Sequence, residues 1–170
     1  MTIKDITEAG FIEDNPKWIE AEKKSEEIHR YVNRIYSELL DPVDNLVKEF
    51  TDKIIEGATK FLNVKSVDTS GSLAEIFLYT YPHEEKKVSI HIVRPNPGYN
   101  KVTEATLKLR NTVAGGDIDL IIPEDASPDN VIRVIELLKP FLEAKDIIDT
   151  NKRRQLINRV NWIESKKHLM

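Results

Sequence analysis

A doubled glycine at positions 115 and 116 constrains the fold of this chain more than any other feature of its sequence. Two-residue hairpin turns need positive φ angles, which glycine adopts without a steric penalty. A turn centred on this pair places apolar residues opposite one another on one face and mostly polar residues on the other: Val113 with Ile118, Asn111 with Leu120, Leu109 with Ile122, Thr112 with Asp119, and Arg110 with Ile121. This alternation predicts a half-buried antiparallel hairpin.

Two further strand patterns precede the hairpin, one apolar and aromatic and the other alternating between apolar and polar residues. The chain therefore predicts a four-stranded, mainly antiparallel meander within residues 67–123, with strands at Leu73–Tyr81, Lys87–Val93, Glu104–Val113 and Asp117–Ile122.

The polar face of this sheet is the first candidate site. We expect it to gather His91, Lys108, Arg110 and Asp119, with Tyr79 beside them. Such a face is either an ordinary solvated surface with cross-strand pairs or a shallow site on which a partner docks.

Helical patterns lie on both sides of the sheet. Asn15-Pro16 and Asp41-Pro42 each combine a capping side chain with a proline at the first helical position, and apolar residues follow at helical spacing. They predict two helices within residues 16–62, arranged either as a hairpin or as one kinked rod. Their apolar stripe either covers the sheet or forms an oligomerisation seam.

The two ends of the chain differ in pattern. Residues 1–14 show no sustained periodicity and are expected to form a flexible arm. Ser127-Pro128 begins a third helix, and a fourth pattern follows within the segment 127–170. Between them, Lys145–Thr150 fits either a short strand or a linker. The expected fold is thus one α+β domain over residues 1–170, a four-stranded sheet with two N-terminal and two C-terminal helices.

Composition narrows the class of protein. The 170 residues contain no cysteine, which excludes disulfides, thiolate metal sites and a cysteine nucleophile. The start of the chain lacks a signal-peptide pattern, and no apolar run reaches the length that spans a bilayer, so we expect a cytoplasmic protein without a membrane partner.

The charge is unevenly distributed along the chain. Residues 150–170 carry six basic groups and one acidic group, whereas the preceding residues have a net charge of −9. This basic end predicts either salt-dependent nucleic-acid binding or pairing with acidic protein surface. The basic groups that flank its apolar positions are Lys152, Arg153, Arg154, Arg159, Lys166 and Lys167.

Asp117 and Asp119 form an Asp-x-Asp pair directly after the glycines. Carboxylates two positions apart on a strand point the same way and can share Mg²⁺ or Mn²⁺, although acids near turns also occur simply as solvated surface groups. The stretch Ala105–Ile122 resembles the palm motif of the nucleotidyltransferase superfamily, most closely that of DNA polymerase beta-like enzymes, because Arg110, Gly116 and the two aspartates match it.

That resemblance implies that Asp117 and Asp119 are catalytic metal ligands for Mg²⁺, with Asp146 or Asp149 as the only guesses for the third carboxylate. The chain departs from the family motif in three positions. Thr106 and Leu107 stand where the family has Gly-Ser, and Leu109 replaces its first basic residue.

The sequence completes no catalytic constellation, since it lacks a phosphate-cradling glycine loop, a nucleophile elbow and a His-x-x-x-His metal pair. The leading expectation is a non-catalytic intracellular binding or assembly domain without a cofactor. Its partner would be another protein or a second copy, bound through the polar sheet face, the helical seam or the basic C-terminal helix. The alternative is a metal-dependent nucleotidyltransferase or a degenerate relative.

Overall fold

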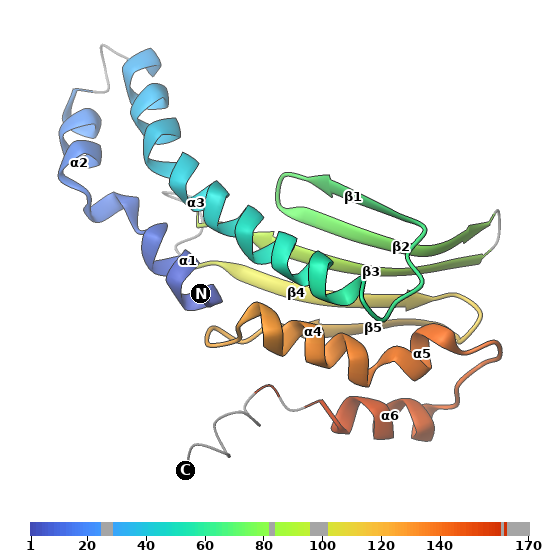
Figure 1. Cartoon of the computed structure of the whole chain (residues 1–170). Helices are drawn as coiled ribbons and strands as arrows, with labels where there is room; N and C mark the ends of the chain where they lie inside the picture. Colours follow the sequence, from blue (N-terminus) through green and yellow to red (C-terminus); the bar gives the residue numbers. More distant parts are fainter. Residues whose placement is uncertain (25–28, 82–83, 96–101, 161, 163–170) are drawn as a thin grey trace.

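The protein combines a five-stranded antiparallel sheet with helices that precede and follow it (Figure 1). The computed structural model describes residues 1–24, 29–81, 84–95, 102–160 and 162. The strands are β1 (Ser66–Ser70), β2 (Leu73–Tyr81), β3 (Glu84–Val93), β4 (Glu104–Asn111) and β5 (Gly116–Ile121). The helices are α1 (Ile3–Ala9), α2 (Pro16–Lys23), α3 (His29–Ala58), α4 (Pro128–Leu137), α5 (Lys139–Glu143) and α6 (Thr150–Asn158), with a 3₁₀ turn at Ile12–Asp14.

The α+β class is confirmed, but the prediction of four strands is wrong. The fifth is β1, which pairs with β2 at the edge of a meander ordered β1-β2-β3-β4-β5. Every residue of β1 is exposed, so it carries no apolar alternation by which it could be recognised. Its turn does leave a signal, because Gly71 has φ of 57° at the first central position of the β1–β2 turn, where type II′ hairpins place glycine.

The hairpin at the doubled glycine exists, but its predicted register is wrong. Residues 112–115 form the turn, and Asn111 pairs with Gly116. Leu109 consequently faces Ile118 rather than Ile122. Because the shift is by an even number of positions, the residues that pair in β4 and β5 stay on the faces that the alternation predicts.

Asn111 explains the longer turn. Its side chain is fully buried, and its Oδ1 accepts hydrogen bonds from the backbone N–H groups of Val113 and Ala114 at 3.0 and 3.2 Å. Its Nδ2 donates to the carbonyl oxygens of Phe141 and Ala144, both at 2.9 Å. One amide therefore ends β4, shapes the turn and fixes the end of α5 against the sheet.

The core lies between one face of the sheet and the helices α3 and α4, which run side by side across it in Figure 1. Gly57 allows their close approach, since a Cβ atom there would collide with the side chain of Ile132. The strand residues that this layer buries completely or nearly so are Ala74, Ile76, Val88, Ile90, Ile92, Ala105, Leu107, Leu109 and Ile118. Burial of each large side chain stabilises the fold by about 1.5–3 kcal/mol.

The predicted start of a second helix at Asp41-Pro42 is wrong, because one helix, α3, runs through both residues, and the division between α2 and α3 comes before His29 instead. Pro42 lies inside α3, and Asn15 caps α2 as expected, accepting a hydrogen bond from Lys17 N at 2.9 Å. Proline removes one helical hydrogen bond, yet Leu40 and Val43 on either side of it are buried, and this burial offsets the loss. Figure 1 shows α3 bending along its length, which is the usual effect of an internal proline.

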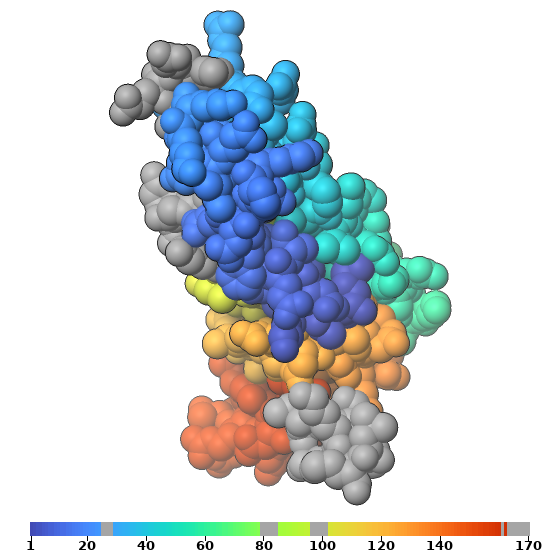
Figure 2. All heavy atoms as spheres, turned by 90° about the vertical axis from the view of Figure 1, so that its left-hand side faces the viewer, coloured from blue at the N-terminus to red at the C-terminus, as the bar shows by residue number. Residues whose placement is uncertain are grey.

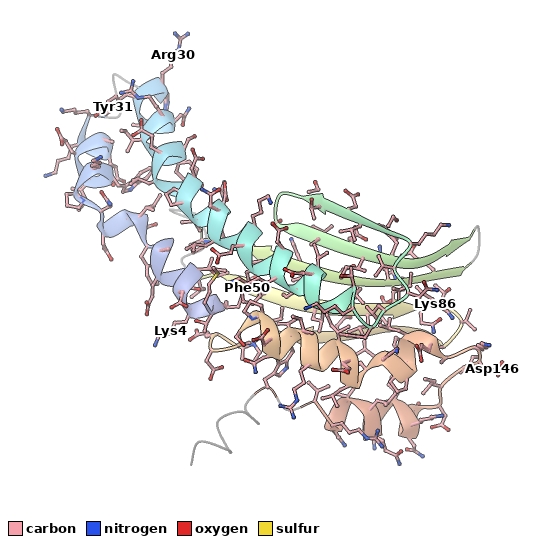
Figure 3. The ribbon with its side chains drawn as sticks, in the orientation of Figure 1. Lys4, Arg30, Tyr31, Phe50, Lys86 and Asp146 are labelled. Carbon is pink, nitrogen blue, oxygen red and sulfur yellow. The ribbon has the colours of Figure 1, made fainter. Side chains whose placement is uncertain are left out.

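Residues 1–14 are not a flexible arm. Thr2 and Asp5 form a reciprocal capping box that begins α1, and Ile3 and Ile6 are buried beneath it. The two isoleucines are too few to register as periodicity, although the Thr-x-x-Asp spacing is a helix-start signal. In Figure 2, α1 and α2 lie along α3, and in Figure 3 Arg30 and Tyr31 mark the end of α3 that extends beyond the sheet.

The predicted start of α4 at Ser127-Pro128 is confirmed, but the prediction of two helices on each side of the sheet is wrong, because the described residues form α1, α2 and α3 before it and α4, α5 and α6 after it. Ser127 caps α4 in a second capping box. Helix α4 ends before Leu138, and Pro140 lies in the first turn of the next helix, α5. Residues 144–149 are a linker rather than a strand, and α6 follows. Among the described helices none combines the length and the apolar character needed to cross a membrane.

We expect Asn111→Asp to destabilise the protein by about 2–4 kcal/mol, because a carboxylate cannot donate to the carbonyls of Phe141 and Ala144 and is repelled by them. Urea unfolding followed by circular dichroism measures the change. The matched control is Asn45→Asp on the exposed side of α3, which should alter stability by less than about 0.5 kcal/mol. Equal stability of the two variants would contradict this role for Asn111.

Candidate binding face

The face of the sheet opposite α3 and α4 is only partly buried, as the alternating burial along β4 shows. We call it the open face. Its charged residues and the polar residues at its centre are Asp68 on β1, Glu75 on β2, Glu85, Lys87, Ser89 and His91 on β3, Glu104, Thr106, Lys108 and Arg110 on β4, and Asp117 and Asp119 on β5. It thus brings together His91, Lys108, Arg110 and Asp119, as predicted, while the side chain of Tyr79 lies outside the described residues.

A chain of ion pairs crosses the open face from β2 to β5. Arg110 binds Asp117 with two hydrogen bonds, Nε to Oδ1 at 2.8 Å and Nη2 to Oδ2 at 3.1 Å. Lys87 Nζ lies 2.6 Å from Glu75 Oε2 and 3.0 Å from Glu85 Oε1. Glu85 also lies 3.5 Å from Arg110 Nη1 and so links the two halves. Such a network holds its side chains in place better than isolated surface pairs do.

The ion pairs shift the ionisation of their members. Hydrogen bonding from Arg110 lowers the pKa of Asp117 against the opposing effect of burial. The same contact raises the pKa of Arg110. Burial lowers the pKa of Lys87, but its hydrogen bonds to Glu75 and Glu85 outweigh this and raise it. Asp117, Arg110 and Lys87 are therefore held in their charged forms at neutral pH.

A shallow hollow of about 260 Å³ lies at the centre of the open face, over β3 and β4. Its lining is rich in hydrogen-bond donors, with one carboxylate among them. The lining residues are Leu73, Glu75, Lys87, Ser89, His91, Thr106, Lys108 and Arg110.

A larger groove of about 550 Å³ lies between α3 and the β1–β2 hairpin. Its charged residues pair with one another, Arg94 with Asp44 of α3 at 2.9 Å and Lys48 with Asp52 along α3 at 2.7 Å. The groove therefore offers fewer uncommitted charges to a ligand than the hollow does.

The two aspartates of the Asp-x-Asp pair have different surroundings. Asp117 is 26% exposed and held by Arg110, whereas Asp119 is 67% exposed and lies 3.7 Å from Lys108 Nζ. Asp149 caps α6 by accepting a hydrogen bond from Lys152 N, and Asp146 points away from the sheet in Figure 3. Within the described residues, no group of three or more His, Asp or Glu side chains is placed to hold a metal ion.

The basic residues predicted to bind nucleic acid differ in their surroundings. Lys152, Arg154 and Arg159 of the α6 region are exposed. Arg153 instead turns inward, with its guanidinium 5.4 Å from the ring centre of Phe141. Lys166 and Lys167 lie outside the described residues.

Sequence reasoning missed the acids that complete the network. Glu75 lies in a stretch that reads as apolar and aromatic, and Glu85 precedes the predicted start of its strand at Lys87. The available signal was the even spacing of Glu85, Lys87 and Ser89, which places them on one face of an extended strand.

Searches against protein-family models, curated proteins and solved structures find no match.

We expect Asp117→Asn to lower stability at pH 7 by about 0.5–1 kcal/mol, a figure reduced for solvent screening of this part-exposed pair. The pKa of Asp117 is lower in the folded than in the unfolded chain. Its stabilising effect is therefore complete above the unfolded pKa of about 3.9 and is lost as the pH falls through the lower folded value.

Denaturant unfolding between neutral pH and about pH 2 should show the difference between wild type and Asp117→Asn shrinking below about pH 4. Asp119→Asn, which removes a more exposed and more distant pair, is the control and should have a smaller effect. A pH-independent difference for Asp117→Asn would rule out this ion pair as its cause.

Proposed function

We propose that this protein is a non-catalytic binding domain that receives a partner protein on the open face of its sheet. The observation that supports this most directly is the hollow at the centre of that face, which is lined by hydrogen-bond donors from two adjacent strands. A rigid sheet positions such side chains more firmly than a loop does.

The state of the charged groups favours binding over catalysis. Arg110 holds Asp117 with two hydrogen bonds and also contacts Glu85, and Lys87 is shared by two acids. Groups held in this way are suited to fixing the orientation of a partner, because complementary charges select partners and their register.

The other two predicted surfaces are less suited to the role. The apolar stripe of α3 is largely used inside the protein, where Val47, Phe50 and Ile54 are buried against the sheet. In the α6 region Lys152, Arg154 and Arg159 are exposed to solvent, but Arg153 packs against Phe141.

Affinity capture from the source cells tests this function with three baits: wild type, Lys108→Glu on the open face, and Lys48→Glu on α3. The two variants make the same charge change at two part-exposed or exposed lysines that each pair with one aspartate. We expect proteins bound by wild type and by Lys48→Glu to be depleted about tenfold or more with Lys108→Glu, because reversal of an interface charge introduces repulsion. Identical capture by all three baits would argue against the open face as the docking surface.

A metal-dependent nucleotidyltransferase is the second candidate, favoured by the placement of Asp117 and Asp119 on one face of β5. Metal binding at this pair would require Arg110 to release Asp117. Thermal unfolding with Mg²⁺ or Mn²⁺ and nucleoside triphosphate separates the candidates. A metal-dependent rise in Tm for wild type that is lost in Asp119→Asn would support the enzyme, whereas the binding domain should show no such rise.

A further inference from the structure

The centre of the open face contains four hydrogen-bond donors in a compact block. Ser89 pairs with Lys108, and His91 pairs with Thr106, in successive cross-strand positions on β3 and β4. Directly opposite residues in an antiparallel pair have Cβ atoms about 4.5–5.5 Å apart, so all four side chains reach the same small volume.

The ion pairs around this block leave its own donors available. Lys87 and Arg110 are occupied by Glu75, Glu85 and Asp117. Lys108 differs, because its ammonium is 3.7 Å from Asp119, beyond hydrogen-bonding distance, and its side chain is 42% exposed. It therefore keeps charge and donor capacity for a ligand.

This set of donors fits an oxyanion. The ammonium group of Lys108, the hydroxyls of Ser89 and Thr106 and the imidazole N–H of His91 can donate hydrogen bonds to the oxygens of one tetrahedral group. Hydrogen bonds to a charged acceptor are stronger than those to a neutral one. The hollow of about 260 Å³ is larger than a carboxylate requires, and its size suits a phosphoryl group together with the first atoms of the side chain that bears it.

The surrounding acids restrict what can carry that oxyanion. Glu75 lines the hollow opposite Ser89, where it is paired with Lys87. The other acids on this face surround the block: Asp68, Glu85, Glu104, Asp117 and Asp119. A nucleic-acid backbone would bring its successive phosphates against these acids, whereas one phosphoryl group set among neutral or basic residues would not. Thr106 and His91 are exposed, so the hollow is open enough to receive a group that projects from a protein surface.

We propose that the hollow formed by Ser89, His91, Thr106 and Lys108 binds the phosphoryl group of a phosphorylated side chain on the partner protein. This inference rests on the proposed function and specifies the chemistry that the open face recognises. Binding is non-covalent: the phosphoryl oxygens replace water as the acceptors of the four donors, and Lys108 supplies the positive charge opposite the phosphoryl group.

NMR titration of the ¹⁵N-labelled full chain tests the proposal with four probes: a short phosphoserine peptide, its unphosphorylated form, its aspartate analogue, and inorganic phosphate. We expect the phosphoserine peptide alone to bind strongly enough to shift the amides of Ser89, His91, Thr106 and Lys108 in a saturable way. Lys108→Gln should weaken this binding about tenfold, the loss of one charge-assisted contact. Lys48→Gln on α3 should leave it unchanged, and the spectra themselves show that each variant is folded.

Absence of shifts at the hollow, or equal affinity in Lys108→Gln, would overturn the proposal. Equal binding of the aspartate analogue would make the hollow a general carboxylate site, and equal binding of inorganic phosphate would make it a free-anion site. Either result also overturns the assignment to a protein-borne phosphoryl group.

Phosphatase treatment of the cell extract separates this proposal from the broader one. If capture depends on Lys108 but survives phosphatase, the open face binds a partner and the phosphoryl assignment fails. If the phosphoserine peptide binds but capture is indifferent to Lys108→Glu, the docking function fails while the site remains. Loss of capture both with phosphatase and with Lys108→Glu supports the two together.

Discussion

The buried side chain of Asn111 is the contact on which the arrangement of the sheet and the C-terminal helices depends. It accepts from the turn after β4 and donates to the carbonyls at the end of α5, so it joins segments 30 residues or more apart in sequence. Without it, the amide of Val113 and the carbonyl of Ala144 would lose these hydrogen bonds, whereas Ala114 N–H and the Phe141 carbonyl would each keep a backbone partner. An apolar residue here would fill space but satisfy none of them.

The same side chain decides the chemistry of the open face. By organising residues 112–115 into the turn, Asn111 sets a register in which Arg110 faces Asp117 and Lys108 faces Asp119. In the register of a two-residue turn, Arg110 would instead face Ile121, and Asp119 would face Thr112. The observed register therefore gives each aspartate a cation directly opposite, and the open face becomes a network of ion pairs.

The limits of sequence reasoning follow from this contact. Periodicity located the buried faces of β3, β4 and β5, because those faces carry an apolar residue at every second position, and capping pairs located the starts of α2 and α4. Turn length depended instead on a side chain that bonds to residues 30 and more positions away, and no local pattern reports that distance.

Strand β1 escaped detection for the opposite reason. Its residues are exposed throughout, so pairing with β2, and not burial, makes it a strand. The open face likewise combines features that local patterns predict with features that strand pairing determines. The sequence placed His91, Lys108 and Arg110 on one face, but which acid neutralises which cation depends on a register that only the folded turn determines.

The edges of the sheet also bear on how a partner can bind. An uncovered strand edge invites a strand from another chain, and charged side chains or a short edge strand discourage it. Here β5 carries Asp117 and Asp119, and β1 is only five residues long with Asp68 at its centre. Strand addition is therefore disfavoured at both edges. The donors at the centre of the open face lie two strands in from β1 and one from β5, out of reach of an added strand, so recognition there must proceed through side chains that project onto the face.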